Sequence, residues 1–473
     1  MLSYEFISDN NDSIEQLAQH LAEMAPKPAD HFMPDNLDDV LERFLSGDSD
    51  SIYSATYSSL DSIDFDQKQV DYQELLGQIL LNPNVPENHH RAYQDFVAYQ
   101  LKVYELMRTA VKYRSVSSKT EKEDAKQKYI KLNEELYGAP ETAIARSMVK
   151  EVINESALIA DPKLQHIRNE FEELLPPEIT DDWESASLIP KPSQAAKEVV
   201  QRIAGILYSP LLDHADRLIA ELMKEEDKTV SELRIGPQGI AVIFQTIINR
   251  EFPDSGWKVV IGPANAIKVN TATKTITMKE DRKPASVEKV RGLVVHELGV
   301  HMLRSIIGEG SNLVPLQYGL EKVSQAEEGL AQIMESTISG DDARKGYQHY
   351  LTATLLKEGY NFDQVFEVMW RYKALDAYLD KPPEKIDEEF INEQQRAAAK
   401  FMFRSIRGSN DLPWYDMLSY FNGTRMWEYI ETHKDDPDLV TLMFMGKIDP
   451  TNISHLKKAL DSHTRFINRA AAG

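Results

Sequence analysis

The chain has 473 residues and no cysteine, which excludes disulfides and thiolate metal ligands. Its formal net charge of −23 disfavours binding to nucleic acid and to anionic membrane surfaces. With 42% hydrophobic and 27% charged residues, the composition is that of a soluble globular protein. No apolar run is long enough to span a membrane, and the first ten residues lack the basic and apolar regions of a secretory signal. We therefore expect a cytoplasmic protein.

The pattern of apolar residues predicts three regions. Residues 1–71 are acidic, and helical spacing of apolar residues predicts short helices within them. Residues 72–228 are expected to form a helical region, in which four prolines between residues 174 and 193 mark a long loop. Residues 229–473 form the third region, in which short strand-like runs appear among helical ones.

Short strands precede an apolar helix in the third region. Ser231–Gly236 is strand-like, and three β-type runs follow it, namely Trp257–Ile261, Ala266–Val269 and Thr275–Met278. The helix is predicted to start after Pro284 with Ser286 as its N-cap. Strands that lead into a long helix indicate an α+β unit. The predicted fold class is therefore α+β, mainly α, with a helical N-terminal region and a small β-sheet before this helix.

The apolar helix contains the motif H-E-x-x-x-H, formed by His296, Glu297 and His301. Histidine is a common zinc ligand, but residues i and i+5 lie about 140° apart on a regular helix. Both rings can reach one ion only if the helix contains a π-bulge, which we expect near Gly299. The alternative is a pair of core histidines bonded to backbone carbonyls. Burial of three ionisable groups without an ion costs free energy, so we favour the metal site.

A catalytic zinc needs a third protein ligand, and the downstream glutamates supply the candidates. Ser324-Gln-Ala-Glu327 fits a capping box, which gives Glu327 a structural role and leaves Glu328 as the candidate ligand. Glu335 lies seven residues further on the same helix face. It is either a hydrogen-bond partner of a ligand histidine or a solvated position.

Together these motifs resemble the H-E-x-x-x-H zinc metallopeptidase family of the microtubule-associated tyrosine carboxypeptidases and their bacterial relatives, the "flavohemoglobin expression-modulating QEGLA motif" proteins. The resemblance covers roughly residues 72–460. It rests on His296-Glu-Leu-Gly-Val-His301, Tyr318-Gly-Leu320 and Glu327-Glu-Gly-Leu-Ala331, with weaker matches at Leu136-Tyr-Gly-Ala-Pro140, Arg404-Ser-Ile-Arg-Gly408, Tyr420-Phe-Asn-Gly423 and Met445-Gly-Lys447.

The resemblance implies a zincin-like metallopeptidase domain and a role for each residue of the motif. His296, His301 and Glu328 would bind Zn²⁺, and Glu297 would be the general base for a zinc-activated water that hydrolyses a peptide bond. The expected activity is that of a carboxypeptidase that removes a C-terminal residue, aromatic residues included, from a peptide or protein substrate. A strand before the helix, Ala266–Val269 for example, could pair with an extended substrate.

Substrate-binding candidates follow from the chemistry of a C-terminal carboxylate. Arg407 can bind such a carboxylate through two hydrogen bonds, unless it only forms a surface salt bridge. Tyr318 and Tyr420 could donate to the developing oxyanion, although a core tyrosine with a satisfied hydroxyl is the favoured interpretation of each. The animal enzymes have a Lys-Asp pair where this chain has Tyr415 and Asp416, which weakens the transfer of their exopeptidase specificity.

Two alternative functions remain open. The chain could be a non-enzymatic regulatory or docking protein with a closed, structural metal site. It could also be an endopeptidase or aminopeptidase that uses the same zinc chemistry. We expect tubulin to be a poor substrate, since an acidic tail would be repelled by the net charge of −23.

Overall fold

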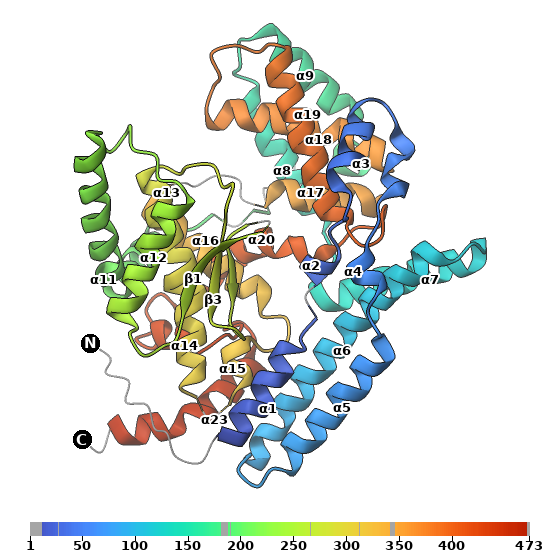
Figure 1. The fold of residues 1–473 in the computed structure, drawn as a ribbon. Coiled ribbons are helices and arrows are strands. Elements are labelled where there is room, and N and C mark those ends of the chain that lie inside the picture. The colour runs from blue at the N-terminus through green and yellow to red at the C-terminus, as the bar shows by residue number, and fades with distance from the viewer. Residues whose placement is uncertain are drawn as a thin grey trace.

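The computed structural model describes residues 12–26, 28–180, 188–189, 191–264, 266–311, 313–340 and 346–470. Helices make up most of them, and a single three-stranded sheet lies among the described residues (Figure 1). The predicted α+β, mainly α fold with a small sheet before the H-E-x-x-x-H helix is confirmed. No described helix is both long enough and apolar enough to cross a membrane.

One hydrophobic core joins the N-terminal helices to helices from the second half of the chain. Phe32 and Leu60 are fully buried in it, so the described part of the acidic N-terminal segment contributes to this core. The helices of this core are α1 (Asp12–Glu23), α2 (Pro28–His31), α3 (Leu37–Leu45), α4 (Ser58–Asp61), α5 (Phe65–Leu81), α6 (Glu87–Ser115), α7 (Lys119–Tyr137), α8 (Thr142–Ser156), α9 (Pro162–Leu174), α10 (Pro177–Thr180), α17 (Tyr347–Lys357), α18 (Phe362–Asp380), α19 (Glu388–Ile406) and α23 (Ile453–Ala470).

A second core surrounds the sheet and the H-E-x-x-x-H helix. It includes α11 (Gln194–Glu226) and α12 (Pro237–Glu251). The sheet has the order β1-β3-β2, in which β1 (Lys258–Gly262) is parallel and β2 (Lys268–Asn270) antiparallel to β3 (Thr275–Lys279). The strand expected at Ser231–Gly236 is absent from the described structure, because only Ile235 pairs there, in an isolated bridge with Ala285.

The H-E-x-x-x-H helix runs without interruption through α13 (Val287–Leu293), η2 (Val294–Met302) and α14 (Leu303–Glu309). The Ser286 side chain accepts a hydrogen bond from the Lys289 backbone N–H, as expected of an N-cap. The middle of this helix is apolar on all sides, which is typical of a buried helix. It therefore holds its ionisable residues in the interior of the second core.

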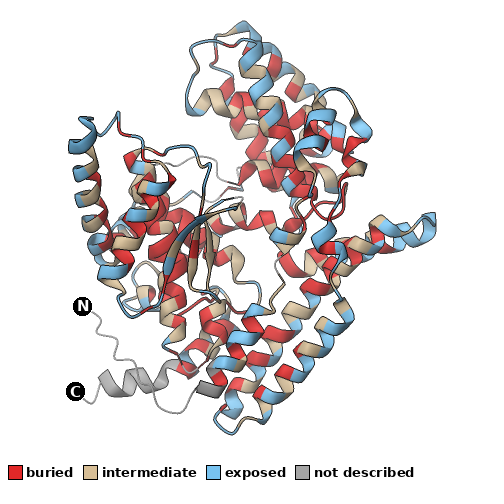
Figure 2. Ribbon diagram, in the orientation of Figure 1, coloured by how far each residue is buried: buried red, intermediate tan, exposed pale blue. Residues whose placement is uncertain are grey.

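Helix α16 (Ser324–Ser339) packs against the H-E-x-x-x-H helix, and most of its residues are buried (Figure 2). It follows α15 (Pro315–Tyr318). Helix α16 also contacts α20 (Ser419–Asn422), η4 (Gly423–Arg425) and α21 (Met426–His433). The elements η3 (Tyr415–Leu418) and α22 (Leu439–Phe444) complete this part of the chain. The division into regions 1–71, 72–228 and 229–473 stays a prediction.

Candidate metal centre

The H-E-x-x-x-H segment is a π-helix over nine residues, Val294–Met302. A π-helix has i→i+5 hydrogen bonds, which places residues i and i+5 on one face. The predicted local widening of the helix is therefore confirmed, although it is longer than a single bulge. As a result, the rings of His296 and His301 lie side by side, with centroids 4.9 Å apart.

Gly299 lies within the π-helix, where the bulge was expected, and it has a further role in packing. A Cβ at this position would lie 2.6 Å from the ring of Tyr208, which α11 packs against the π-helix. The glycine is therefore required for close approach between two helices. The hydrophobic pattern of either helix alone does not show this contact.

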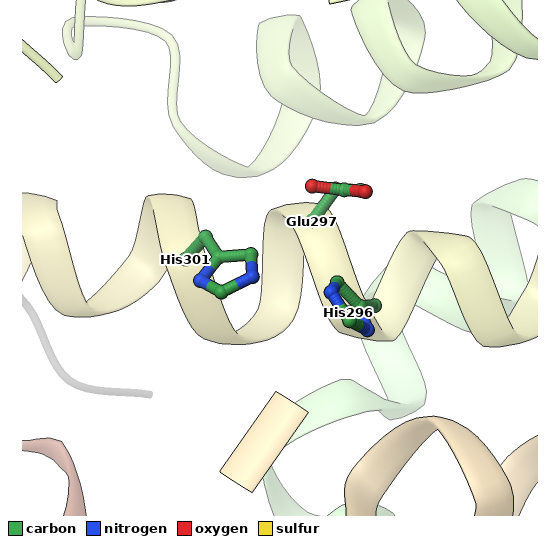
Figure 3. A group of neighbouring side chains, drawn as sticks. All are labelled: His296, Glu297 and His301. Atoms are coloured by element: carbon green, nitrogen blue, oxygen red, sulfur yellow. The ribbon is translucent and has the colours of Figure 1, made fainter. Parts of the chain in front are cut away.

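Three ligand atoms from His296, Glu297 and His301 lie within 4.8 Å of one another. Figure 3 shows the two imidazole rings on one side of the helix, with the Glu297 carboxylate projecting beside them. Glu297 and His301 are buried, and His296 is nearly so. Buried imidazole and carboxylate groups that lie this close together can hold a metal ion.

Glu328 faces both histidines from α16. Its carboxylate oxygens lie 3.9 Å from Nε2 of His296 and 3.8 Å from Nε2 of His301. Two ligands of a tetrahedral zinc lie about 3.4 Å apart, given bond lengths of about 2.1 Å. The three side chains thus converge on a volume that suits one cation, and Glu328 is where the predicted third ligand should be.

The other ring nitrogen of each histidine is held by a different glutamate. Nδ1 of His296 lies 2.9 Å from Glu335, and Nδ1 of His301 lies 3.1 Å from Glu327. Because a carboxylate can only accept, each Nδ1 carries the proton and each Nε2 is free to bind a metal. Such carboxylate partners orient ligand histidines in metal sites.

The capping box predicted for Glu327 is wrong. Helix α16 has Val323 at its N-cap position and no side-chain cap, and Ser324 is already inside the helix. Glu327 is buried instead, where it pairs with the fully buried Arg304 and contacts His301. Its structural role is thus to orient a histidine rather than to cap a helix.

Two cations keep Glu327 ionised. Lys447 Nζ lies 3.3 Å from its carboxylate, opposite Arg304, whose guanidinium also donates to the Ile448 carbonyl. Burial alone would raise the pKa of Glu327, but Arg304 and Lys447 hold it well below its ordinary value. A permanently ionised Glu327 can accept a hydrogen bond from Nδ1–H of His301 at any physiological pH.

The electrostatics of the centre favour a bound cation. Burial alone would lower the pKa of His296, yet Glu335, Glu297 and Glu328 raise it to about 9. The acidic surroundings therefore stabilise positive charge at this position, whether a proton or a metal cation supplies it. Burial also raises the pKa of Glu297, while the two imidazoles oppose this rise.

A contact between two glycines brings the Tyr420 segment to the centre. A Cβ on Gly329, next to Glu328, would lie under 3.0 Å from the backbone of Gly423. The Glu328 carboxylate, together with burial, raises the pKa of the nearby Tyr420 phenol. The ring of His349 stacks on Tyr420 with centroids 5.3 Å apart. Tyr420 is therefore held beside Glu328 with its phenol protonated.

Arg407 contacts the segment that leads into Tyr420, because its Nη2 lies 3.4 Å from Sδ of Met417. Burial raises the pKa of Asp416 to about 6, with Arg407 lowering it and Glu328 raising it. Burial also lowers the pKa of Arg407 to about 10. Asp416 and Tyr420 thus feel the charges of both Glu328 and Arg407. The surface salt bridge considered for Arg407 does not fit its burial.

Tyr318 lies apart from the residues described above, and Arg304 and Lys447 are part of the centre although they were not predicted. Tyr318 is half-buried at the end of α15 and packs against the first core, and its role as an oxyanion donor stays a prediction. Sequence reasoning missed Arg304 and Lys447. Arg304 could have been found, because an arginine three residues after His301 in an apolar helix indicates a buried acid nearby. Lys447 was part of the weak Met445-Gly-Lys447 match, which assigned it no role.

Comparison with known proteins gives one match. Residues 208–378, less than half of the chain, match the family model described as "Microtubule-associated tyrosine carboxypeptidase". This segment contains the π-helix, Glu328 and Glu335. No curated protein and no solved structure matched the chain.

Proposed function

We propose that this chain, whose residues 208–378 belong to the microtubule-associated tyrosine carboxypeptidase family, is a zinc-dependent carboxypeptidase with His296, His301 and Glu328 as metal ligands. The observation that carries the proposal is the orientation of the two histidines. Both present Nε2 to Glu328 while Glu335 and Glu327 hold their Nδ1 protons. Two histidines that are each oriented by a glutamate and that both present Nε2 to Glu328 are difficult to explain without a cation between these three side chains.

Glu297 is the proposed general base. Its carboxylate lies within 4.8 Å of the ligand atoms of both histidines. It is not one of the two carboxylates that hold the Nδ1 atoms. It can take the proton of an attacking water and pass it to the leaving amine. Zinc held by the three ligands would lower the pKa of water toward ~7 and polarise the scissile carbonyl. The raised pKa of Glu297 makes it a better base than an exposed glutamate.

Tyr420 is the proposed donor to the oxyanion. Its phenol stays protonated at neutral pH because Glu328 and burial raise its pKa. A protonated phenol beside a metal ligand can donate to a carbonyl oxygen as that oxygen gains negative charge. Strand β2 is at the edge of the sheet and contacts the π-helix, so it is the strand that we expect to pair with an extended substrate.

Arg407 is the proposed anchor for the terminal carboxylate. It is a buried cation in electrostatic range of Asp416 and Tyr420, which are themselves in range of Glu328. In support of this role, Nη2 of Arg407 contacts Met417, and α20, which follows Met417 in the chain, contacts α16, the helix of Glu328. Tyr415, at the position where the animal enzymes have lysine, is buried and contributes no charge.

Replacement of Arg407 tests exopeptidase specificity. We expect Arg407→Gln to raise KM for a peptide with a free C-terminus about 10- to 100-fold, which corresponds to one charge-assisted hydrogen-bond pair. Zinc content should not change. The measurement is release of the C-terminal residue from matched free, amidated and N-acetylated peptides. Cleavage by the natural enzyme that is equally fast for the amidated peptide would exclude a carboxypeptidase and favour an endopeptidase or aminopeptidase.

The family name describes enzymes that act on tyrosine and associate with microtubules. For this chain we propose an aromatic C-terminal residue of a cytoplasmic peptide or protein as substrate. The net charge of −23 disfavours a long acidic tail near the scissile bond. The measurement compares kcat/KM for two peptides that end in tyrosine, one with neutral and one with acidic preceding residues. A lower kcat/KM for the acidic peptide is the expected result.

A further inference from the structure

Arg407 is contacted from the N-terminal part of the chain. Its Nη1 lies 3.7 Å from Sδ of Met33, and its Nη2 lies 3.4 Å from Sδ of Met417. The guanidinium carbon lies 4.1 Å from the centroid of the Trp414 ring. Among the described residues, Arg407 Nε is buried without a hydrogen-bond partner. Within the described part of the chain, the guanidinium therefore contacts two sulfur atoms and an aromatic face, and it forms no hydrogen bond with a carboxylate.

This environment orients the guanidinium without using up its donors. A thioether sulfur is only a weak acceptor, and an aromatic face attracts the cation without occupying its N–H groups. Asp416 compensates part of this charge electrostatically, but no described carboxylate forms a hydrogen bond with the guanidinium fork. An incoming carboxylate would be a directly bonded partner, with two parallel hydrogen bonds to this fork.

Met33 is held in place by its neighbours. Phe32 is fully buried and meets the edge of the Trp414 ring, with centroids 5.4 Å apart. A Cβ on Gly408, the residue after Arg407, would lie 2.6 Å from the Phe32 ring, and Gly408 has a φ of +83°. On the other side of Phe32, Asp30 pairs with Lys268 of β2. The segment from Asp30 to Met33 is thus fixed between the sheet edge and the Arg407 loop.

We propose that Met33 is a positioning residue that aims Arg407 at the C-terminal carboxylate of the substrate, so that the N-terminal segment completes the carboxylate subsite. The inference rests on the proposed carboxypeptidase function. Both Met33 and Arg407 lie outside residues 208–378, the part that matches the family model. The residues that bind the C-terminus of the substrate therefore come from other segments than the one that carries the metal ligands.

An internal competitor gives the sharpest test. Met33→Glu places a carboxylate where the sulfur meets Arg407, and Met33→Gln is its neutral match. Both are made in the hydrolysis-deficient Glu297→Gln protein, and the dissociation constants of a tyrosine-terminated peptide with a free or an amidated C-terminus are measured by calorimetry. Ala29→Glu, at an exposed position of α2, controls for added charge. Zinc content and the unfolding midpoint are recorded for every variant.

We expect the reference protein, Met33→Gln and Ala29→Glu to prefer the free C-terminus about 10- to 100-fold. Met33→Glu should bring this ratio close to one, with unchanged zinc content and an unfolding midpoint that is not lowered. A ratio in Met33→Glu equal to that of the reference would overturn the role of Met33 and leave the carboxypeptidase standing. No preference in the reference protein would overturn the carboxypeptidase itself, and the inference with it.

A second variant covers the case in which Met33→Glu does not fold. Met33→Ala removes the sulfur contact and lets the guanidinium move, so the preference for the free C-terminus should fall at least about threefold. Met33→Leu, which keeps the volume, should lose less of it. An unchanged ratio in Met33→Ala would contradict the positioning role.

Discussion

Glu297→Gln should bind zinc as well as the natural protein and hydrolyse peptides at least about 10³ times more slowly, because it removes the general base and keeps the side-chain shape. The residue is buried and burial raises its pKa. A neutral amide should therefore leave the free energy of unfolding unchanged or slightly higher. The measurement is single-turnover release of a C-terminal tyrosine, with zinc determined on the same samples.

The matched control is Glu288→Gln, on an exposed position of the same helix. It should retain full activity, because Glu288 lies in the first turn and faces solvent. If Glu297→Gln released tyrosine at the natural rate, another group would have to be the base. If it lost zinc, Glu297 would be a ligand rather than a base.

Gly329→Ala should damage both stability and activity. The added Cβ would meet the Gly423 backbone at under 3.0 Å, and a backbone contact cannot be relieved by a side-chain rotation. We expect a loss of about 2 to 4 kcal/mol in the free energy of unfolding. Because Glu328 precedes Gly329, a shift of this turn should also lower kcat/KM roughly 100-fold.

Gly205→Ala is the control for the general effect of replacing a helical glycine. Gly205 is exposed in α11, and a Cβ there would meet no atom within 4 Å. This change should raise the free energy of unfolding by about 0.5 to 1 kcal/mol. Denaturant titration of both variants measures the two changes in the free energy of unfolding. A Gly329→Ala protein as stable and active as the natural one would show that the glycine contact does not set the position of Glu328.

The π-helix illustrates what the sequence could predict. The spacing of His296 and His301 is incompatible with a regular helix that binds one ion with both rings, so helical geometry alone indicated a widened segment. It could not assign the role of Gly299, because that depends on Tyr208, about ninety residues away in the chain. A contact between two helices has no signature in the pattern of either one.

The choice of Glu328 over Glu327 was reached from the sequence through a wrong premise. Local pattern suggested a cap for Glu327, whereas the structure gives it a buried partnership with Arg304, Lys447 and His301. A match to a capping pattern describes only neighbours in the sequence, and tertiary ion pairs override it. The prediction that Glu335 contacts a ligand histidine agrees with its position 2.9 Å from His296.

The substrate side was the least predictable part. Arg407 was chosen because guanidinium binds carboxylate, but its burial against two methionines and a tryptophan could not be foreseen. The acidic composition of residues 1–71 did not indicate where this segment packs. Its apolar residues, Phe32 among them, pack on the Arg407 loop. Long-range packing of this kind needs the fold itself.

The most direct test of the metal centre is zinc content, measured by elemental analysis of protein purified without a histidine tag. The natural chain should hold about one zinc per molecule, and so should Glu288→Ala, which changes an exposed glutamate. Glu328→Ala should lose most of its zinc after dialysis against a weak chelator, since a three-ligand site loses one ligand. Equal zinc in Glu328→Ala and the natural chain, or none in either, would contradict the assignment of His296, His301 and Glu328 as a zinc site.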